Sequence, residues 1–209
     1  MNRIVKGPWK WACWSVPLAA ALGLFLSGCV SMYVPNGLPE VAPADYVKPQ
    51  HPAAVQLLVD WTTEGKSNTK ALAETRGEVV SVVNESGLFA STSRDPVPSA
   101  ALLAITIDDS PITNPNSAFA KGFLTGFTFG LIGTKGFEGY TCTVTYIPSN
   151  GADKLTHVTR QPLIFTMGAH AAPDNSIPAP TLKDAVRTMI RRTVGNALKE
   201  LAVDPAFTR

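Results

Sequence analysis

The stretch AVQLLVDWT, residues 54–62, decides how the rest of the chain is interpreted. Its apolar side chains occupy every second position, which is typical of a strand with one buried face. These are Val55, Leu57, Val59 and Trp61. Residues 69–86 then change to a helical spacing, and Gly87 suits the C-terminal end of that helix. A second β-branched run, ALLAITI at 101–107, follows, so the pattern predicts a βαβ unit.

The second half of the chain predicts two more strands and one helix. YTCTVTYI (140–147) alternates apolar residues with threonines, and KLTHVTRQPLIFTM (154–167) returns as a long strand. Pro162 predicts a bulge or an edge position for this last strand, because proline cannot donate to a ladder. Residues 168–180 are expected to form a loop. Thr181 and Asp184 resemble a capping box for the final helix.

The final helix carries a wide apolar stripe at helical spacing. The stripe consists of Val186, Met189, Ile190, Val194, Ala197, Leu198 and Leu201. The element order is therefore β-α-β-(insert)-β-β-α. We predict an α+β fold with two layers, in which two helices cover one face of a four-stranded mixed sheet.

The N-terminus has three parts in a fixed order. Arg3, Lys6 and Lys10 form a basic region, and an apolar run from Val16 to Leu26 follows it. That run is too short to cross a bilayer as a helix, but it has the length of the apolar part of a signal peptide. It ends in Leu26-Ser27-Gly28-Cys29.

Leu26, Ser27, Gly28 and Cys29 resemble the lipobox of bacterial lipoproteins. The resemblance implies that residues 1–28 are a signal peptide, that the chain is cut before Cys29, and that Cys29 is acylated. The partner would then be membrane lipid. In that family an aspartate directly after the cysteine marks retention at the inner membrane. Val30 occupies this position here, which favours the outer membrane. We expect the domain to face the periplasm. An ordinary signal peptide with an incidental cysteine is the alternative.

Composition limits the function classes further. Without residues 1–28, the chain has 15 basic and 16 acidic residues, which excludes a nucleic-acid-binding role based on charge. Cys142 is then the remaining cysteine besides Cys29, and its strand pattern predicts a buried small side chain. Residues 29–53 contain five prolines and predict an extended tether that holds the domain, residues 54–209, off the membrane.

Sequence motifs for catalysis are absent, so we expect a non-enzymatic protein without a cofactor or metal. Asp108 and Asp109 at a strand end are the best candidates for a cation site or a base, although two adjacent carboxylates provide too few ligands alone. His51, His157 and His170 are far apart in sequence. Arg187, Arg191 and Arg192 on the last helix are expected to lie on its solvated face, with an anion site as the alternative.

The most unusual segment is the apolar, glycine-rich insert at residues 117–138. On a helix over 118–135, its glycines fall within an arc of about 80°, which is the spacing that lets helix backbones approach closely. These are Gly122, Gly126, Gly130 and Gly133, and the apolar residues between them include Phe123, Phe127 and Leu131. The insert could dip into the leaflet, pack on a partner or another copy, or pack on its own sheet.

These observations predict a lipid-anchored envelope protein that binds or scaffolds at the membrane, as an accessory subunit with a probable protein partner or by self-association. A membrane-inserting oligomer built on the glycine helix is one alternative. A small enzyme or metal binder at Asp108 and Asp109 is another. In element order, the domain loosely resembles small periplasmic α/β modules such as the lipopolysaccharide-assembly lipoprotein.

Overall fold

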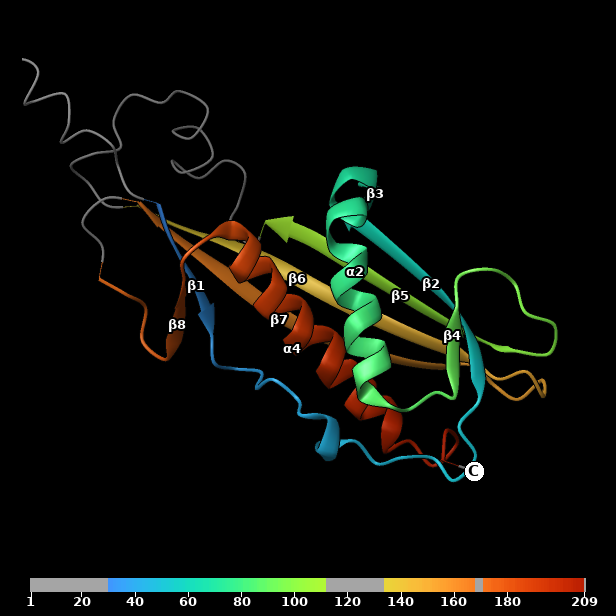
Figure 1. The fold of residues 1–209 in the computed structure, drawn as a ribbon. Helices are drawn as coiled ribbons and strands as arrows, with labels where there is room; N and C mark the ends of the chain where they lie inside the picture. Colours follow the sequence, from blue (N-terminus) through green and yellow to red (C-terminus); the bar gives the residue numbers. More distant parts are fainter. Residues whose placement is uncertain (1–29, 112–133, 168–170, 209) are drawn as a thin grey trace, which may run out of the picture.

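The computed structural model describes residues 30–111, 134–167 and 171–208. These residues form one mixed sheet of eight strands, and the helices α2 (Thr69–Ser86) and α4 (Leu182–Ala202) pack side by side on one face of it (Figure 1). The strand order is β3-β2-β5-β6-β7-β1-β8, and β4 also pairs with β2. Strand β2 runs parallel to β5, so β2, α2 and β5 form the expected βαβ unit.

The strands differ greatly in length. The central ones are β2 (Ala54–Thr63), β5 (Ala101–Pro111), β6 (Thr134–Ile147) and β7 (Leu155–Met167). The short ones are β1 (Val30–Pro35), β3 (Lys66–Ser67), β4 (Ser91–Ser93) and β8 (Ser176–Ala179), and a short 3-10 helix, η1, spans Pro43–Asp45.

The predicted four-stranded sheet is wrong, because four shorter strands extend it to eight. The α+β class and the placement of two helices on one face agree with the structure. Three of the missed strands have two to four residues, too few for an alternating pattern to be recognised. One of them, β8, lies within the stretch 168–180 that was expected to be a loop.

The predicted tether at residues 29–53 is also wrong for the part that the structure describes. Val30 to Pro35 form β1, which pairs with β7 on one side and β8 on the other. The following segment packs along the molecule, where Val41 and Tyr46 are buried and Tyr46 Oη donates to the Gly195 carbonyl at 3.3 Å. The prolines in this region interrupt an ordered segment and do not produce a free linker.

Both predicted helices are confirmed, α2 at its C-terminal end and α4 at its N-terminal end. The helix α2 stops at Gly87, which has a positive φ of 61° that a side chain would strain. The Thr181 hydroxyl accepts a hydrogen bond from the Asp184 N–H at 3.1 Å and so caps α4. The α4 stripe is buried against the sheet, with only Val186 partly exposed.

Strand β7 lies inside the sheet, and its pairing with β6 runs without a bulge from Leu155 to Met167. No bulge is present, but the expected edge position is confirmed at Pro162, because residues 155–163 pair with β6 alone among the described strands. Pro162 is tolerated because β1 pairs only with residues 164–167, so no neighbour needs its missing N–H on that side.

One end of the sheet brings together segments that are far apart in sequence. Val30 of β1 pairs with Met167 of β7, and Met167 pairs on its other side with Thr134 of β6. Adjacent strands lie about 4.8 Å apart, so the Val30 and Thr134 backbones are about 10 Å from each other. We call this the Val30 end of the sheet.

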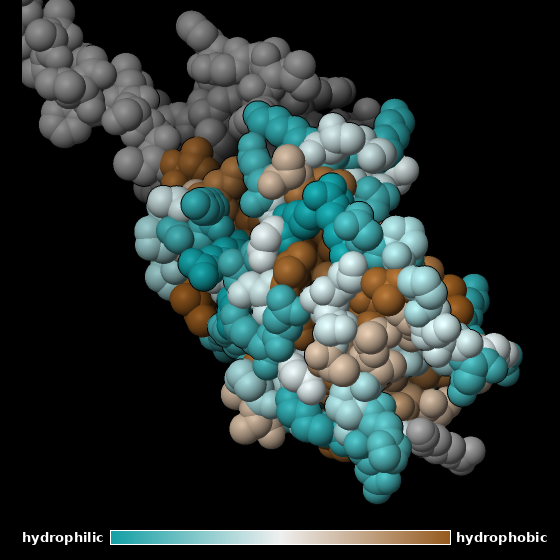
Figure 2. Space-filling view, turned by 45° about the vertical axis from the view of Figure 1, so that its right-hand side comes forward, coloured by the Kyte–Doolittle hydropathy of each residue, from teal (hydrophilic) through white to brown (hydrophobic). Residues whose placement is uncertain are grey.

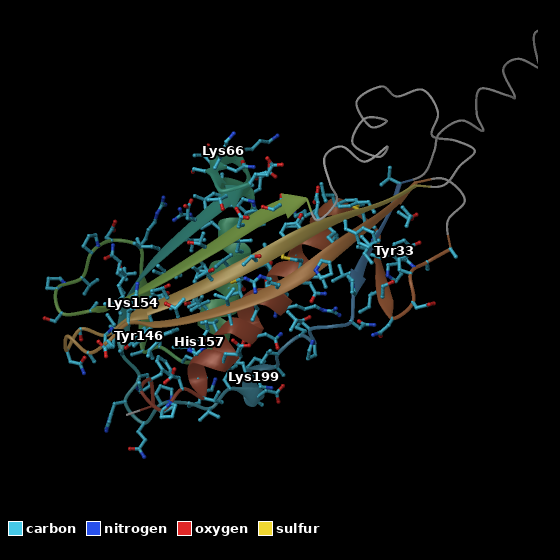
Figure 3. All side chains as sticks on the ribbon, turned by 180° about the vertical axis from the view of Figure 1, so that it is seen from behind. Tyr33, Lys66, Tyr146, Lys154, His157 and Lys199 are labelled. Atoms are coloured by element: carbon cyan, nitrogen blue, oxygen red, sulfur yellow. The ribbon has the colours of Figure 1, made fainter. Side chains whose placement is uncertain are left out.

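The opposite face of the sheet carries no helix in the described part of the chain (Figure 3). Threonines from β5, β6 and β7 lie on it, among them Thr106, Thr143 and Thr156. We call it the outer face. Among the described residues, no helix is both long and apolar enough to cross a membrane.

Candidate functional site

A cavity of about 910 Å³ lies between the sheet and the N-terminal halves of α2 and α4. Its size is in the range of small-molecule sites. Apolar side chains supply much of its wall, including Trp61, Phe165, Val186 and Ile190. Its polar groups include Glu74 and Glu78 from α2, Asp109 and Glu138 from the sheet, and Lys183 and Arg187 from α4.

The period of the strands places two acids under the helices. Asp109 follows Ile107 on the inward face of β5, and Glu138 precedes Tyr140 on the inward face of β6. Asp109 pairs in register with Tyr140, so Glu138 lies on the diagonal from Asp109. Diagonal neighbours on one sheet face are within reach of long side chains. Both carboxyls therefore line the floor of the same cavity.

The electrostatics of these acids are unusual. Burial raises the pKa of Asp109 to about 7, and the nearby charges of Glu138, Asp108 and Glu64 add to this shift. Burial also raises the pKa of Glu138, although a hydrogen bond from Tyr140 Oη at 3.0 Å opposes that shift. The cavity floor thus holds two carboxyls that resist being charged together.

Trp61 forms the wall beside these acids. Its ring meets the Tyr140 ring edge to face, with centroids 6.0 Å apart. The side chain is 3% exposed, and its Nε1 has no hydrogen-bond partner within the described chain. A buried indole N–H usually has a partner, so this one is a free donor beside the cavity.

Two of the cavity's charged groups are already engaged. Glu78 accepts from Arg187 at 3.0 Å and from Arg191 at 3.0 Å. Arg187 is therefore held at the cavity rim by an acid of α2. In Figure 2 apolar surface is visible between hydrophilic side chains on the face turned toward the viewer.

The structure separates the aspartates that the sequence placed together. Asp108 and Asp109 are neighbours in one strand, so they point to opposite faces of the sheet. Asp108 is held by Ser110 Oγ at 2.6 Å, by the Gly65 N–H at 2.9 Å and by Thr62 Oγ1. Burial alone would raise the pKa of Asp108, but these hydrogen bonds stabilise the charged carboxylate more strongly, so the pKa is lowered. A joint site for the pair is excluded by this geometry, and the described residues contain no cluster suited to a metal ion.

The three arginines of α4 occupy different environments. Arg187 is largely exposed, as predicted. Arg192 is buried at 6% exposure and donates to the Pro35 carbonyl at 2.7 Å and to Asn36 Oδ1 at 3.2 Å. Arg191 binds the carboxylates of Glu40, Glu78 and Glu85. A solvated face is therefore wrong for Arg191 and Arg192, which fasten the N-terminal segment and α2 to α4.

Other residues singled out from the sequence lie away from the cavity. His157 on β7 approaches Asp204 at 3.4 Å near the end of α4 (Figure 3), and His51 is exposed. Cys142 is fully buried as predicted, and burial raises the pKa of its thiol to about 12. His170 lies outside the described residues.

The lipobox and the glycines of the insert also lie outside the described residues. This applies to Leu26, Ser27, Gly28 and Cys29, and to Gly122, Phe123, Gly126, Phe127, Gly130, Leu131 and Gly133. The end of the insert is described, however, and residues 134–138 belong to β6. The predicted helix and insert therefore extend too far, because these residues pair with β7 and Glu138 lines the cavity.

No protein-family model and no curated protein sequence matches the chain. Among solved structures, it is similar to rare lipoprotein B from Shewanella oneidensis, with 12% identity, a TM-score of 0.36 and coverage of 70% of this chain and 93% of the other. It is also similar to a PelC dodecamer from Paraburkholderia phytofirmans, with 11% identity, a TM-score of 0.32 and coverage of 85% and 98%. A minor lipoprotein from Acinetobacter baumannii shows 10% identity, a TM-score of 0.30 and coverage of 72% and 89%. At such low TM-scores these similarities carry no conclusion about function.

The sequence predicted Asp109 as a site residue but with the wrong partner, and it did not indicate Glu138. Asp109 was grouped with Asp108, whereas its spacing from Ile105 and Ile107 places it on the buried face. Glu138 was assigned to the insert. A charged residue on the apolar face of a strand is the signal that identifies both positions.

Proposed function

We propose that this chain is an envelope lipoprotein, anchored through an acylated Cys29, whose domain binds a ligand in the cavity at the membrane surface. In this proposal the protein is attached to the outer membrane and its domain faces the periplasm. It binds its ligand without catalysing a reaction. The lipobox-like residues before Cys29 support the anchor. A second acyl chain on the same residue would make the attachment stable, because one chain alone binds only reversibly.

One structural observation carries the proposal. The residue after Cys29 is Val30, which already pairs with Met167 of β7, and Met167 in turn pairs with Thr134 of β6. An acyl chain on Cys29 would therefore hold the Val30 end of the sheet at the lipid surface. The point where the glycine-rich insert rejoins the sheet lies at this same end.

The cavity also lies near the Val30 end. Phe165 is two residues before Met167, and Glu138 is four residues after Thr134. A ligand in the cavity would therefore be bound close to the membrane. This position suits a protein that receives or holds an amphiphile or a membrane-associated partner.

Binding accounts for the cavity better than catalysis does. In the described part of the chain, neither a histidine nor a cysteine lines it. Nucleophilic catalysis needs a nucleophile with a base in hydrogen-bond reach, and the buried Cys142 has neither exposure nor a lowered pKa. The cavity instead combines apolar walls with a few polar groups, as ligand sites do.

The anchor is tested with Cys29→Ala in cells fed a labelled fatty acid. We expect the variant to lose the label and to accumulate as precursor or as another processing product. Cys13→Ala is the matched control, because it removes a thiol from the same region but leaves the lipobox intact. An unchanged label and membrane fraction for Cys29→Ala would contradict the anchor. The cavity is tested separately below.

A further inference from the structure

The lining of the cavity has more acidic than basic side chains. Its lining includes four carboxyls, on Glu74, Glu78, Asp109 and Glu138, against the cationic Lys183 and Arg187. Arg187 is paired with Glu78 at the rim. Within the described residues, neither Asp109 nor Glu138 has a cationic side chain within ion-pair distance. A bound cation would relieve the repulsion between these two acids.

A second observation also points to a ligand. Trp61 lines the same cavity, is 3% exposed and carries an unpartnered Nε1. A buried donor without a partner costs stability, so its retention beside two buried carboxyls is unexpected for a packing residue. Aromatic faces such as those of Trp61 and Tyr140 also attract cations.

We propose that the cavity binds a molecule that carries a primary ammonium group on an apolar body, with Asp109 and Glu138 as its counter-charges. This inference rests on the proposed function only in taking the cavity as the binding site. The ammonium would lie at the floor between the two carboxyls, and the apolar body would contact Phe165, Val186 and Ile190. A free amine and the headgroup of an ethanolamine lipid share this chemistry, and the phosphate of the lipid also offers the acceptor that the Trp61 Nε1–H lacks, which the ammonium group cannot supply.

Competing ligand classes fit the lining less well. A divalent cation requires six to eight oxygen ligands or several waters, and no three acids, histidines or cysteines among the described residues are placed so that they could hold a metal ion. A purely anionic ligand would have to enter beside four carboxyls. A neutral apolar ligand would leave the two floor acids without a counter-charge, at an energetic cost.

Binding should depend on pH in a defined direction. The titratable and charged groups around the floor come from all the packed elements: Glu74 and Glu78 of α2, Asp109 of β5, Glu138 and Tyr140 of β6, and Lys183 and Arg187 of α4. The pKa of Asp109 is raised to about 7, so it is protonated at mildly acidic pH. Alkylammonium groups stay charged there, as lysine does. Affinity for the ammonium should therefore fall as the pH drops below about 7.

The intrinsic fluorescence of Trp61 provides a local reporter. The other tryptophans are Trp9, Trp11 and Trp14, all within residues 1–28. Changing these three to phenylalanine in the full chain leaves Trp61 as its single tryptophan, whether or not residues 1–28 are removed. The purified protein is titrated with octylammonium, octanol and octanoate, which share one apolar body and differ in the head group.

We expect octylammonium to change Trp61 emission saturably and to bind at least about tenfold more tightly than octanol, with octanoate weakest. Asp109→Asn should lower the octylammonium affinity by about tenfold and leave octanol binding unchanged. Glu138→Gln should act in the same direction. Asp60→Asn is the control, because Asp60 is exposed on the outer face and Asn keeps the side-chain oxygen that accepts from the backbone N–H of Trp61.

Equal affinities for the three probes, or an Asp109→Asn variant that binds octylammonium normally, would overturn the ammonium assignment but leave the cavity as a binding site. If no probe changes the emission or the unfolding temperature, the binding part of the proposed function fails as well. Titration with short-chain phosphatidylethanolamine and phosphatidylglycerol shows whether the bound ammonium group belongs to a lipid headgroup or to a free amine. Preference for the ethanolamine lipid assigns a lipid headgroup, whereas binding of octylammonium alone assigns a free amine.

Discussion

Asp109 is an acidic side chain at a position of the sheet that otherwise faces the hydrophobic core. A carboxyl is seldom placed on the inward face of a strand unless it is paired, because its charged form is poorly solvated there. Its neighbours on β5, Ile105 and Ile107, are fully buried. The acid is kept at a position where a valine or isoleucine would pack better, which is the pattern expected of a residue retained for binding.

Asp109 makes stability fall as pH rises. Its folded pKa, about 7, is above the ordinary value near 3.9, so the folded chain binds the extra proton between these values. Stability from this group is present below about pH 4 and is lost as pH rises through about 7. Asp109→Asn should therefore gain about 1–2 kcal/mol at pH 8, after allowance for partial solvent exposure, and little at pH 4. Urea unfolding at the two pH values measures this, and an equal effect at both would contradict it.

Arg191 is the second residue whose role depends on its neighbours. It joins Glu40 of the N-terminal segment, and Glu78 and Glu85 of α2, to α4. Arg191→Ala should cost about 1–3 kcal/mol, because three carboxylates would then be left close together in a partly buried site. Arg160→Ala, at an exposed position of β7, should cost less than about 0.5 kcal/mol. Equal losses in chemical denaturation would show that the ion-pair cluster contributes nothing.

At the scale of elements, β1 changes the architecture most. It pairs with residues 164–167 of β7 and so covers the end of that strand's edge, and Val34 of β1 is 1% exposed. A strand edge left open exposes unpaired backbone groups and promotes association with other chains. The segment before β2 is therefore part of the folded domain.

Val34→Asp tests the role of β1. A charge at this buried position should lower the free energy of unfolding by several kcal/mol, about 3 or more. Val47→Asp is the matched control in the same segment, because Val47 is 51% exposed and should tolerate the charge. Similar stabilities for both variants in thermal unfolding would mean that β1 is not packed as described.

The insert is tested by a shorter deletion than its sequence suggested, because residues 134–138 belong to β6. Removing residues 117–133 and joining Asn116 to Thr134 with a Gly/Ser linker should leave the domain folded, with a change of about 1 kcal/mol from loop closure. The insert's role at the membrane stays a prediction. If the deletion unfolds the domain, the insert belongs to its core.

Gly126→Leu combined with Gly130→Leu distinguishes two possible roles of the insert, insertion into the membrane leaflet and packing between helices. Leucine favours hydrocarbon, so leaflet insertion should survive or strengthen in a vesicle flotation assay. Packing of helix backbones should be lost, because the substitutions fill the face along which the glycines allow close approach. Retained cross-linking between copies would therefore contradict a glycine-mediated contact.

For the whole molecule, long periodic segments were predictable and short pairings were not. The strands at 54–62, 101–107 and 140–147 and both helices follow from periodicity, because each buries one face against the core. The strand β8 has four residues and exists only because β1 is there to pair with it. The cavity also requires tertiary information, since Trp61, Asp109 and Glu138 meet only through strand register.

Because β1 begins at Val30, no residue separates this strand from Cys29, and the length of the sheet limits how far an anchored copy extends from the membrane. The strand β6 runs 14 residues away from the Val30 end, which corresponds to a rise of about 45 Å. In an acylated chain, the far tip at the Asn150-Gly151 turn would reach at most about that distance from the lipid surface, and tilting about Cys29 would bring it closer. Any partner that contacts this tip would have to lie within about 45 Å of the membrane, so the length of the sheet would limit the depth of the envelope that an anchored copy can reach.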